Sequence, residues 1–365
     1  IFAPLLTGNY AIGALLVFVK TLSEYGTPYT LGRRIGFYVF TTDIHRYSTT
    51  APIDFGRSAS LSAILIGICM VMWLLQNFVT EKSSYGLLSG KGSRTTELAL
   101  SWPGKILSGV WIGLVILFAI GVPYFSIIST SLIKLRGFGL AAGNFVLDHY
   151  AELFQSPRAL SAIWNSLILA VSAASICSLL GTIVVLFAQR AKGVWKKLLE
   201  GISLLPEMLP SIVLIIGIML FWNAIYKILP LYNTLGIMIL AYVVLYLPYT
   251  VQYVTSAFTQ INPHLLEAGR SFGASPHYVF RHITLPLISR GIIAGGMMIF
   301  IIAFRELVTA SLIAPPNTLV VSTYINREFE QGSVSSGMAM AVLCVLITCA
   351  ALLLFNHFTD DRKDA

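Results

Sequence analysis

The chain has 365 residues, of which 56% are hydrophobic and only 11% are charged, and its mean hydropathy is +0.79. Soluble domains carry about 25% charged residues, so this composition excludes an ordinary soluble protein and indicates an integral membrane protein. The net charge of +8 is also found in nucleic-acid binders, but in a membrane protein it is better explained by Lys and Arg in cytosolic loops. We therefore expect contact with membrane lipid and no nucleic-acid partner.

Eight apolar runs are long enough to cross a bilayer, which takes about 20 residues of helix. A backbone in lipid must satisfy its own hydrogen bonds, so each run is predicted to be helical and the fold to be an all-α, polytopic helical bundle. The predicted spans are 3–23, 59–79, 106–128, 162–188, 200–222, 234–257, 287–305 and 334–356.

Lys and Arg are unevenly distributed between the two sides of these spans. They are denser in 80–105, 189–199, 258–286 and the tail 358–365 than in the longer loops opposite. Positively charged loops stay in the cytosol, so these four segments are predicted to be cytosolic. Residues 80–105 are also rich in Gly and Ser, which is typical of a flexible linker between two membrane units.

The polar segment between the sixth and seventh spans, residues 262–286, has the pattern of two short capped helices. Asn262 is a predicted N-cap with Pro263 at the first helical position, and Ser275–Pro276 repeats that arrangement. Gly273 is the predicted left-handed residue that ends the first helix. A short polar hairpin on the cytosolic side favours a docking element for another protein.

Self-comparison finds an internal repeat with an offset of 282 residues. The opening run I-F-A-P-L-L-T-G-N-Y matches the run from Ile283, and Glu24 and Thr27 then fall opposite Glu306 and Thr309. With a one-residue slip, T-D-I-H meets T-Y-I-N. Apolar spans align easily by chance, but glutamates and prolines at one fixed offset favour a true repeat.

The repeat predicts the organisation of the chain. Residues 1–79 would be the last two spans of a first repeat, 80–105 the linker, 106–357 a complete six-span second repeat, and 358–365 a tail. Residue 1 would then lie near the end of a first copy of the hairpin, in a native polypeptide of about twelve spans. Ile1 is not a methionine, which fits a fragment or a processed product.

The hairpin resembles the EAA motif of ABC importer permeases, which reads E-A-A, three residues, Gly, nine residues and then I-x-L-P. The chain matches this pattern at Glu267, Ala268, Gly273, Ile283, Leu285 and Pro286. It departs at Gly269, where a small residue is nevertheless kept. N-F-V-L-D-H-Y-A-E-L-F at 144–154 and W-N-S-L at 164–167 extend the resemblance over the six-span second half.

The resemblance implies a permease fold in which this loop is a coupling helix seated on a separate ATPase. The implied coupling residues are Glu267, Ala268, Gly269, Gly273, Ala274, Ile283, Leu285 and Pro286. The implied partners are two ATP-binding ABC subunits on the cytosolic side and a periplasmic or extracellular solute-binding protein, at a bacterial inner membrane.

The two fused halves, with R-E-L-V-T-A-S-L-I-A-P-P at 305–316, look most like the ferric-iron subgroup of these permeases. That subgroup is close to permeases for polyamines, thiamine, phosphonates and sugar phosphates, which stay open as alternatives. A secondary transporter driven by an ion gradient is the rival from another class. It would also contain a repeat and a broken helix, but it would not need a docking hairpin.

Motifs for chemistry within the chain are weak. Residues 86–93, G-L-L-S-G-K-G-S, superficially resemble a phosphate-binding loop. That motif needs four residues between its glycines and a Ser or Thr after its Lys, whereas here three residues separate the glycines and Gly92 follows Lys91. We therefore expect no catalytic site and no cofactor in this chain, and ATP bound by a partner subunit. The histidines show no metal-binding spacing, and Asp43 and His45 are interpreted as a surface pair in an outer loop.

Ionisable residues at membrane depth are costly and are candidates for the transport pathway. Glu207 stands between Pro206 and Pro210, which together predict a broken helix with free backbone groups. It either lines the pathway or faces the ATPase at an inner helix end.

Glu24 and Glu306 are predicted to end equivalent spans on the outer side. They either form an acidic pair at the pathway mouth, suited to a cation, or each pairs with a nearby base such as Lys20 or Arg305.

Overall fold

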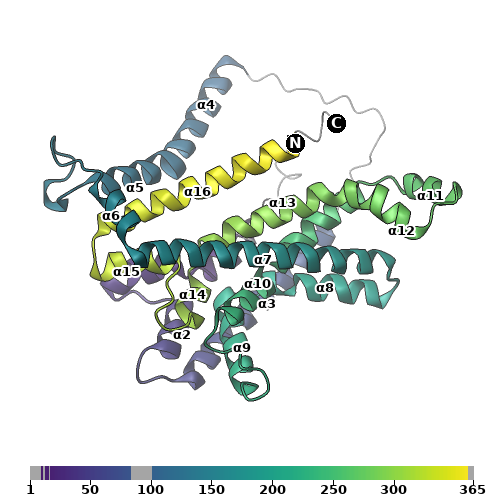
Figure 1. Ribbon diagram of the computed structural model, residues 1–365, viewed down its shortest axis with the longest axis horizontal. Helices are drawn as coiled ribbons and strands as arrows, with labels where there is room; N and C mark the ends of the chain where they lie inside the picture. The colour runs from purple at the N-terminus through teal and green to yellow at the C-terminus, as the bar shows by residue number, and fades with distance from the viewer. Residues whose placement is uncertain (1–9, 11–12, 16, 84–100, 361–365) are drawn as a thin grey trace.

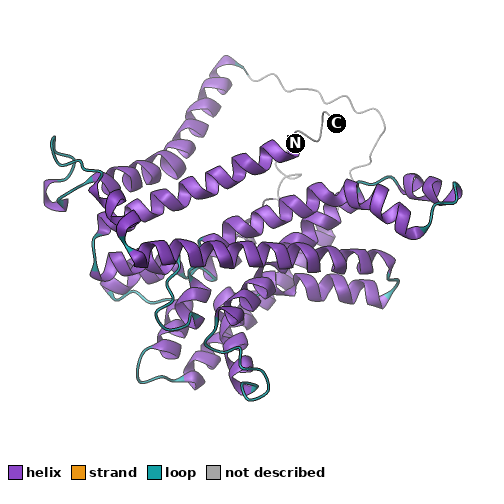
Figure 2. Cartoon of the chain, in the orientation of Figure 1, coloured by secondary structure: helices purple, strands orange, loops and turns teal. Residues whose placement is uncertain are grey.

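The computed structural model describes Tyr10 and residues 13–15, 17–83 and 101–360. Over these residues the chain is helical and carries a single isolated β-bridge, which confirms the predicted all-α class (Figures 1 and 2). The main helices are α2 (Phe40–Thr49), α3 (Phe55–Ser83), α4 (Trp102–Ile116), α5 (Val122–Leu132), α6 (Asp148–Gln155), α7 (Pro157–Arg190), α8 (Val194–Met208), α9 (Ser211–Ala224), α10 (Leu235–Thr259), α11 (Pro263–Ser271), α12 (Pro276–Val279), α13 (Leu285–Phe304), α14 (Val308–Ile313), α15 (Val321–Gln331) and α16 (Val334–Asp360).

Three long helices, α7, α10 and α13, pack against one another at the centre of the bundle (Figure 1). Small residues let them approach closely: a Cβ atom on Gly181 would lie 2.7 Å from Thr250 Cγ2, and one on Gly291 would lie 2.7 Å from the carbonyl oxygen of Tyr253. Lipid tails are as apolar as the side chains, so spans associate through this kind of close contact.

Six helical stretches of the described chain are long and apolar enough to cross a membrane, and each corresponds to a predicted span. They are Phe55–Leu75, Trp102–Leu132, Pro157–Arg190, Leu235–Thr259, Pro276–Phe304 and Val334–Phe355. The predicted span 3–23 lies partly outside the described residues, and its described part within Gly13–Leu22 is helical.

The predicted span 200–222 is broken, as its two prolines indicate: it is split into α8 and α9, which meet at 107°. Pro206 lies inside α8 and Pro210 is the N-cap of α9. Proline cannot donate a backbone hydrogen bond and clashes with the preceding turn, so the break falls where the two prolines predict it.

The hairpin α11–α12 and the α7–α8 turn lie at one end of the bundle, and α15 and the α5–α6 connection lie at the other (Figure 1). Two segments predicted to be cytosolic therefore share an end. Most of the predicted linker, with the residues that echo a phosphate-binding loop, lies outside the described residues, as does the end of the tail.

The two copies of the internal repeat make the same hydrogen bonds. Glu24 Oε1 accepts from the Thr27 N–H at 3.2 Å, and Glu306 Oε1 accepts from the Thr309 N–H at 3.0 Å. Both carboxylates thus cap a short helical turn in the same manner. The equivalence supports the repeat, while the domain boundaries drawn from it stay a prediction.

The same correspondence continues at the starts of α2 and α15. The Val39 N–H donates to Thr42 Oγ1 at 2.8 Å, and the Val320 N–H donates to Thr323 Oγ1 at 3.0 Å. These pairs differ by 281 residues, which is the one-residue slip expected from the sequence. The two repeats therefore share local geometry from the end of one span to the next helix.

The first-repeat segment packs on α9 and α14 of the second repeat. Tyr25, Ile44 and Leu65 form one buried cluster with Ile212 and Ile216 of α9. An ion pair between Arg33 and Glu330 at 3.0 Å also joins the two segments, but its side chains are substantially exposed, so it contributes little. The junction therefore depends mainly on apolar burial.

His45 differs from the sequence expectation of a surface pair. Only 8% of it is exposed, and its ring lies 5.2 Å from the ring centroids of both Tyr25 and Tyr29. The residue lies on helix α2 rather than in an irregular loop, and the helical period turns it inward. Burial lowers the pKa of His45 to about 4, and the charge of Arg33 acts in the same direction.

Candidate functional site

The hairpin between α10 and α13 has the capping geometry that its sequence predicts. Asn262 Oδ1 accepts from the His264 N–H at 3.0 Å, and Ser275 Oγ accepts from the Tyr278 N–H at 3.3 Å. Gly273 has φ of +80°, in the left-handed region that a β-carbon disfavours. The turn is thus set by local chemistry and needs no partner to form.

Gly269, the departure from the EAA pattern, lies where the two helices of the hairpin touch. A Cβ atom there would lie 3.0 Å from Ile283 Cδ1 and 3.3 Å from Val279 Cγ2. Glycine therefore lets α11 sit closer to the following helix. Ala274, by contrast, closes the turn, since its N–H donates to the Gly269 carbonyl at 3.1 Å.

The opposite face of α11 points to solvent. Leu265 and Ala268 are exposed, and Phe272 is 92% exposed. Beside them, Glu267 is also exposed and its Oε2 lies 3.4 Å from His264 Nδ1. The face carries an aromatic anchor with charge next to it, which is the composition of a protein–protein contact.

The last part of the hairpin runs directly into a span. α12, a π-helical turn at Phe280–Thr284 and α13 form one continuous helix, so Ile283, Leu285 and Pro286 lie on the element that enters the membrane. The helix that contains the predicted span 287–305 therefore begins earlier, at Pro276. No loop separates the second helix of the hairpin from α13.

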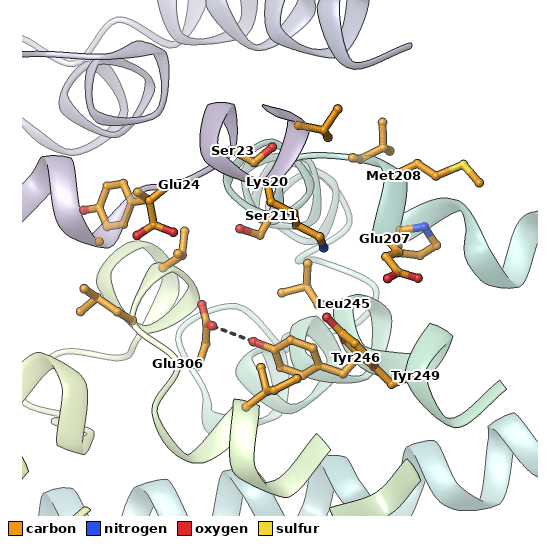
Figure 3. A pocket seen from close by; sticks show the side chains of 18 of the residues that line it. Lys20, Ser23, Glu24, Glu207, Met208, Ser211, Leu245, Tyr246, Tyr249 and Glu306 are labelled. Carbon is orange, nitrogen blue, oxygen red and sulfur yellow. Dashed lines mark hydrogen bonds between the residues drawn. The ribbon is translucent and has the colours of Figure 1, made fainter. Parts of the chain in front are cut away.

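A cavity of about 580 Å³ lies between the first repeat and the second (Figure 3). Three of its lining residues are glutamates from distant parts of the chain: Glu24 after the first span, Glu207 near the end of α8, and Glu306 after α13. Pro206 lines the cavity too. Pro210 does not; it is buried at the start of α9.

Two of these glutamates are held by side chains of α10. Tyr246 Oη donates to Glu306 Oε2 at 2.6 Å, and Gln252 Nε2 donates to Glu207 Oε2 (Figure 3 draws the first of these bonds). Helix α10 leads directly into the hairpin. Helix α10 thus joins the hairpin end of the bundle to the cavity carboxylates.

Two cations, Lys20 and Arg305, also line the cavity. Across residues 17–83 and 101–360, neither forms an ion pair with Glu24 or Glu306, so the alternative in which each glutamate pairs with a local base is not found. Three carboxylates against two cations leave the cavity with an excess of negative charge.

The carboxylates remain spread around the cavity. In the described part of the chain, no three His, Cys, Asp or Glu side chains come together closely enough to hold a metal ion. Carboxylate and hydroxyl oxygens are nevertheless the donors that hard cations prefer. In this part of the chain the carboxylates stand apart and do not form a closed chelate.

Sequence reasoning missed the contribution of α10. Tyr246, Tyr249 and Gln252 are three residues apart, so they share one face of the helix, and the first two line the cavity. A polar, aromatic stripe within an otherwise apolar span was the available signal. This signal does not predict which glutamates the side chains of α10 contact.

Comparison with known proteins agrees with this geometry. Residues 178–364, just over half of the chain, match the family described as binding-protein-dependent transport system inner membrane component. A crystal structure of a bacterial ABC transporter involved in the import of the polysaccharide alginate shares the fold, with a TM-score of 0.56 at 20% identity over 70% of this chain and 96% of that chain.

Curated relatives extend the match beyond that region. The ferric transport system permease protein FbpB of Actinobacillus pleuropneumoniae is 25% identical over all of this chain and 52% of its own length. FbpB 2 of Haemophilus influenzae is 25% identical over 95% of this chain and 65% of its own, so the chain spans only part of both relatives. The spermidine/putrescine permease PotB of the same organism is 26% identical over 68% of this chain. The chain belongs to the binding-protein-dependent inner-membrane components, the permeases of ABC importers.

Proposed function

We propose that this chain forms part of the pathway of an ATP-driven importer and couples to an ATPase through the loop 262–286. The supporting observation is that both helices flanking the hairpin reach the cavity between the repeats. α10 brings Tyr246 and Gln252 to the glutamates, and α13 ends two residues before Glu306. Closure of an ATPase against the exposed face of α11 would therefore move two walls of the cavity together.

The proposed coupling residues divide into three roles. Glu267 and Ala268 lie on the exposed side and contact the ATPase, while Gly269 and Ala274 keep the hairpin compact. Gly273 sets the turn. Ile283, Leu285 and Pro286 pass the movement to the membrane helix.

The proposed cargo is ferric iron. Two relatives that match nearly the whole chain are named as ferric permeases, and the cavity presents carboxylates and tyrosine hydroxyls to a passing cation. Conduction needs sites that bind weakly enough to release, which suits glutamates that stand apart. Polyamines, which are also cations, are an alternative, because PotB is 26% identical over 68% of this chain.

The remaining partners follow from the family. We propose two ATP-binding subunits, one for each repeat, and a solute-binding protein on the outer face, in a bacterial inner membrane. ATP is bound by the partner subunits, and this chain carries out no hydrolysis.

The test is uptake by the full-length complex in liposomes, with its ATPase and binding protein, assayed for ferric iron, spermidine, thiamine, a phosphonate and a sugar phosphate. We expect ATP-dependent iron uptake that Glu267→Arg and Gly273→Val abolish. Gly143→Val is the matched control, since Gly143 also has positive φ and open space but lies in the outer loop before α6.

Other outcomes separate the alternatives. Uptake driven by an ion gradient without ATP would establish the secondary-transporter mechanism instead. ATP-driven uptake of another solute would keep the permease and overturn iron. Normal uptake by Glu267→Arg, with its ATPase bound normally, would remove the coupling role.

A further inference from the structure

An apolar groove of about 640 Å³ runs along the seam between α3 and α8. Helix α8 packs on α7 and α10 and touches α3 only slightly, so one side of it is left open. Exposed apolar side chains recur along that side at helical spacing: Val194, Leu198, Ile202 and Leu205. Exposed apolar side chains are ordinary in a membrane span, because lipid tails are equally apolar. The shape and the charge of the groove therefore decide what it holds.

The groove has the dimensions of a single extended chain. A β-carbon on Gly201, midway along the open side, would meet nothing within 4 Å, so this glycine leaves a notch between Leu198 and Leu205. The lining reaches from Val194 to Met208, about 21 Å at 1.5 Å per residue. The mean cross-section is then about 30 Å², whereas a helix 10–12 Å across occupies about 80 Å² or more. The groove is too narrow for another helix, and it is long enough for an acyl chain in one leaflet, about 15 Å deep.

Positive charge lies at one end of the groove. Lys197, near the start of α8, is the one charged residue among the described residues that line it. In the described part of the chain Lys197 forms no ion pair, and neither do Arg190 and Lys192 nearby, while Lys196 lies 3.9 Å from Glu200. The α7–α8 turn lies at the hairpin end of the bundle, the end predicted to be cytosolic (Figure 1). Basic clusters beside membrane helices on the cytosolic side attract anionic headgroups.

Trp195 indicates the depth of this cluster in the membrane. Its ring is 72% exposed in the first turn of α8, and exposed tryptophans gather at the level of the lipid headgroups. Lys197 is two residues further along the same helix. The charged end of the groove thus lies at headgroup depth, and the rest of the groove runs from there into the hydrocarbon.

We propose that this groove binds one anionic phospholipid. Lys197 holds the phosphate, and one acyl chain lies along α8 over Gly201 towards Met208. Met208 lines both the groove and the cavity that contains the glutamates, and it follows Glu207 in the chain. The bound chain therefore supports one wall of the cavity from the lipid side. This site does not depend on the cargo or on the coupling loop.

Other occupants fit the groove less well. A zwitterionic lipid matches the apolar part equally well, but it offers Lys197 no net negative charge. Water needs two to four polar partners, which an apolar lining does not supply. A protein helix exceeds the cross-section. An anionic headgroup on an acyl chain matches both the charged end and the apolar length.

Photolabelling by lipid tests the proposal. The full-length complex is reconstituted in liposomes that contain phosphatidylglycerol or the zwitterionic phosphatidylethanolamine, each with a diazirine in the same acyl chain, and labelled positions are found by peptide mass spectrometry. We expect phosphatidylglycerol to label Met70 and Ile202 about fivefold more than phosphatidylethanolamine does, the factor for one lysine near the surface. Leu179, exposed on α7 and outside the groove lining, should show no preference. Equal labelling by the two probes in the groove, or none, would overturn the proposal.

A pair of glycine variants tests the place of the acyl chain. Gly201→Trp fills the notch, while Gly67→Trp puts the same side chain on α3 outside the groove lining, and a β-carbon at either position meets nothing within 4 Å. Each variant is measured on the opposite helix, at Met70 for Gly201→Trp and at Ile202 for Gly67→Trp. We expect at least a fivefold loss of labelling in Gly201→Trp and little change in Gly67→Trp. Unchanged labelling in Gly201→Trp would overturn the site.

A pair of lysine variants tests the headgroup contact. Lys197→Gln and Lys192→Gln remove the same charge from the same end of the bundle, but of the two only Lys197 lines the groove. Lys197→Gln should abolish the preference for phosphatidylglycerol at Ile202, and Lys192→Gln should keep most of it. Equal losses in the two variants would show that general surface charge attracts the lipid, and would overturn the assignment of the phosphate to Lys197.

Discussion

The hairpin and the cavity are assembled in opposite ways. The hairpin is a continuous stretch whose turn, caps and close contact come from residues within about one helix length of each other. The cavity is lined by residues from Val19 to Val308, and the hydrogen bond from Tyr246 to Glu306 joins residues 60 apart. The hairpin can thus be changed with local effects, whereas each change in the cavity also touches the contact between the repeats.

The largest expected effect is at the exposed end of the hairpin. Phe272→Glu replaces a ring that is 92% exposed with a charged side chain. Because the ring is exposed, its replacement should not affect folding. If Phe272 anchors the ATPase, its loss should cost about 2 kcal/mol or more of binding, roughly a 30-fold weakening. Co-purification of the ATPase and ATP-dependent uptake are the measurements.

Phe138→Glu is the control for this change, because Phe138 is also well exposed but lies in the α5–α6 connection, at the end of the bundle opposite the hairpin. It should leave ATPase binding unchanged. Equal loss in the two variants would mean that general damage, not docking, explains the result, and the contrast between hairpin and cavity would fail.

The difference between the two sites also explains what the sequence can predict. Asn262, Gly273 and Ser275 act through their own neighbours, so spacing alone predicts the hairpin. The repeat predicts that Glu24 and Glu306 are equivalent, but it does not predict that both are helix caps. The bonds Tyr246–Glu306 and Gln252–Glu207 depend on how α10 rotates against α8 and α13, which no local pattern encodes. The inward turn of His45 was missed for a related reason: its helix was read as a loop.

The cavity is expected to respond less strongly, and two variants of one residue separate its roles. Glu306→Gln keeps an oxygen to cap Thr309 but removes the charge, while Glu306→Ala removes both. Loss of one carboxylate should lower iron uptake about tenfold, equivalent to about 1.4 kcal/mol. The alanine should in addition destabilise the protein by about 1 kcal/mol, the usual cost of a lost cap.

Uptake and apparent Tm in detergent measure these two effects separately. Glu24→Gln provides the comparison in the other repeat, since Glu24 makes the same cap and lines the same cavity. If Glu306→Gln lowers Tm but leaves uptake intact, the carboxylate is structural and the cavity is not the pathway.

A pH-dependent effect on stability, and not on uptake at neutral pH, is expected behind the cavity wall, where His45 packs on Tyr25. The pKa of His45 is about 4 in the folded chain and 6.5 when the side chain is free. The unfolded state therefore binds a proton first as pH falls, so the stabilisation is complete above pH 6.5 and is lost between pH 6.5 and 4, by at most about 1.4 kcal/mol per pH unit.

His45→Asn removes this titration, and asparagine is the residue at the counterpart position, Asn326. Apparent Tm measured from pH 7.5 to 5 should fall more steeply in the wild type than in the variant. Equal slopes of Tm against pH in the two proteins would show that protonation of His45 does not destabilise the folded chain.

The smallest effect is expected at Gly269, where the hairpin departs from the family pattern. Alanine in a helix gains about 1 kcal/mol over glycine, but here its Cβ would meet Ile283 Cδ1 at 3.0 Å, the movable end of a side chain. The two terms nearly cancel, so Gly269→Ala should change stability by no more than about 0.5 kcal/mol and leave uptake within about twofold. Gly269→Leu cannot be relieved in that way and should separate α11 from the helix that follows, with loss of uptake but normal insertion. If Gly269→Ala abolished uptake as Gly269→Leu does, α11 would have to pack more tightly than its contacts with Ile283 and Val279 require. A single methyl group at this position would then decide coupling.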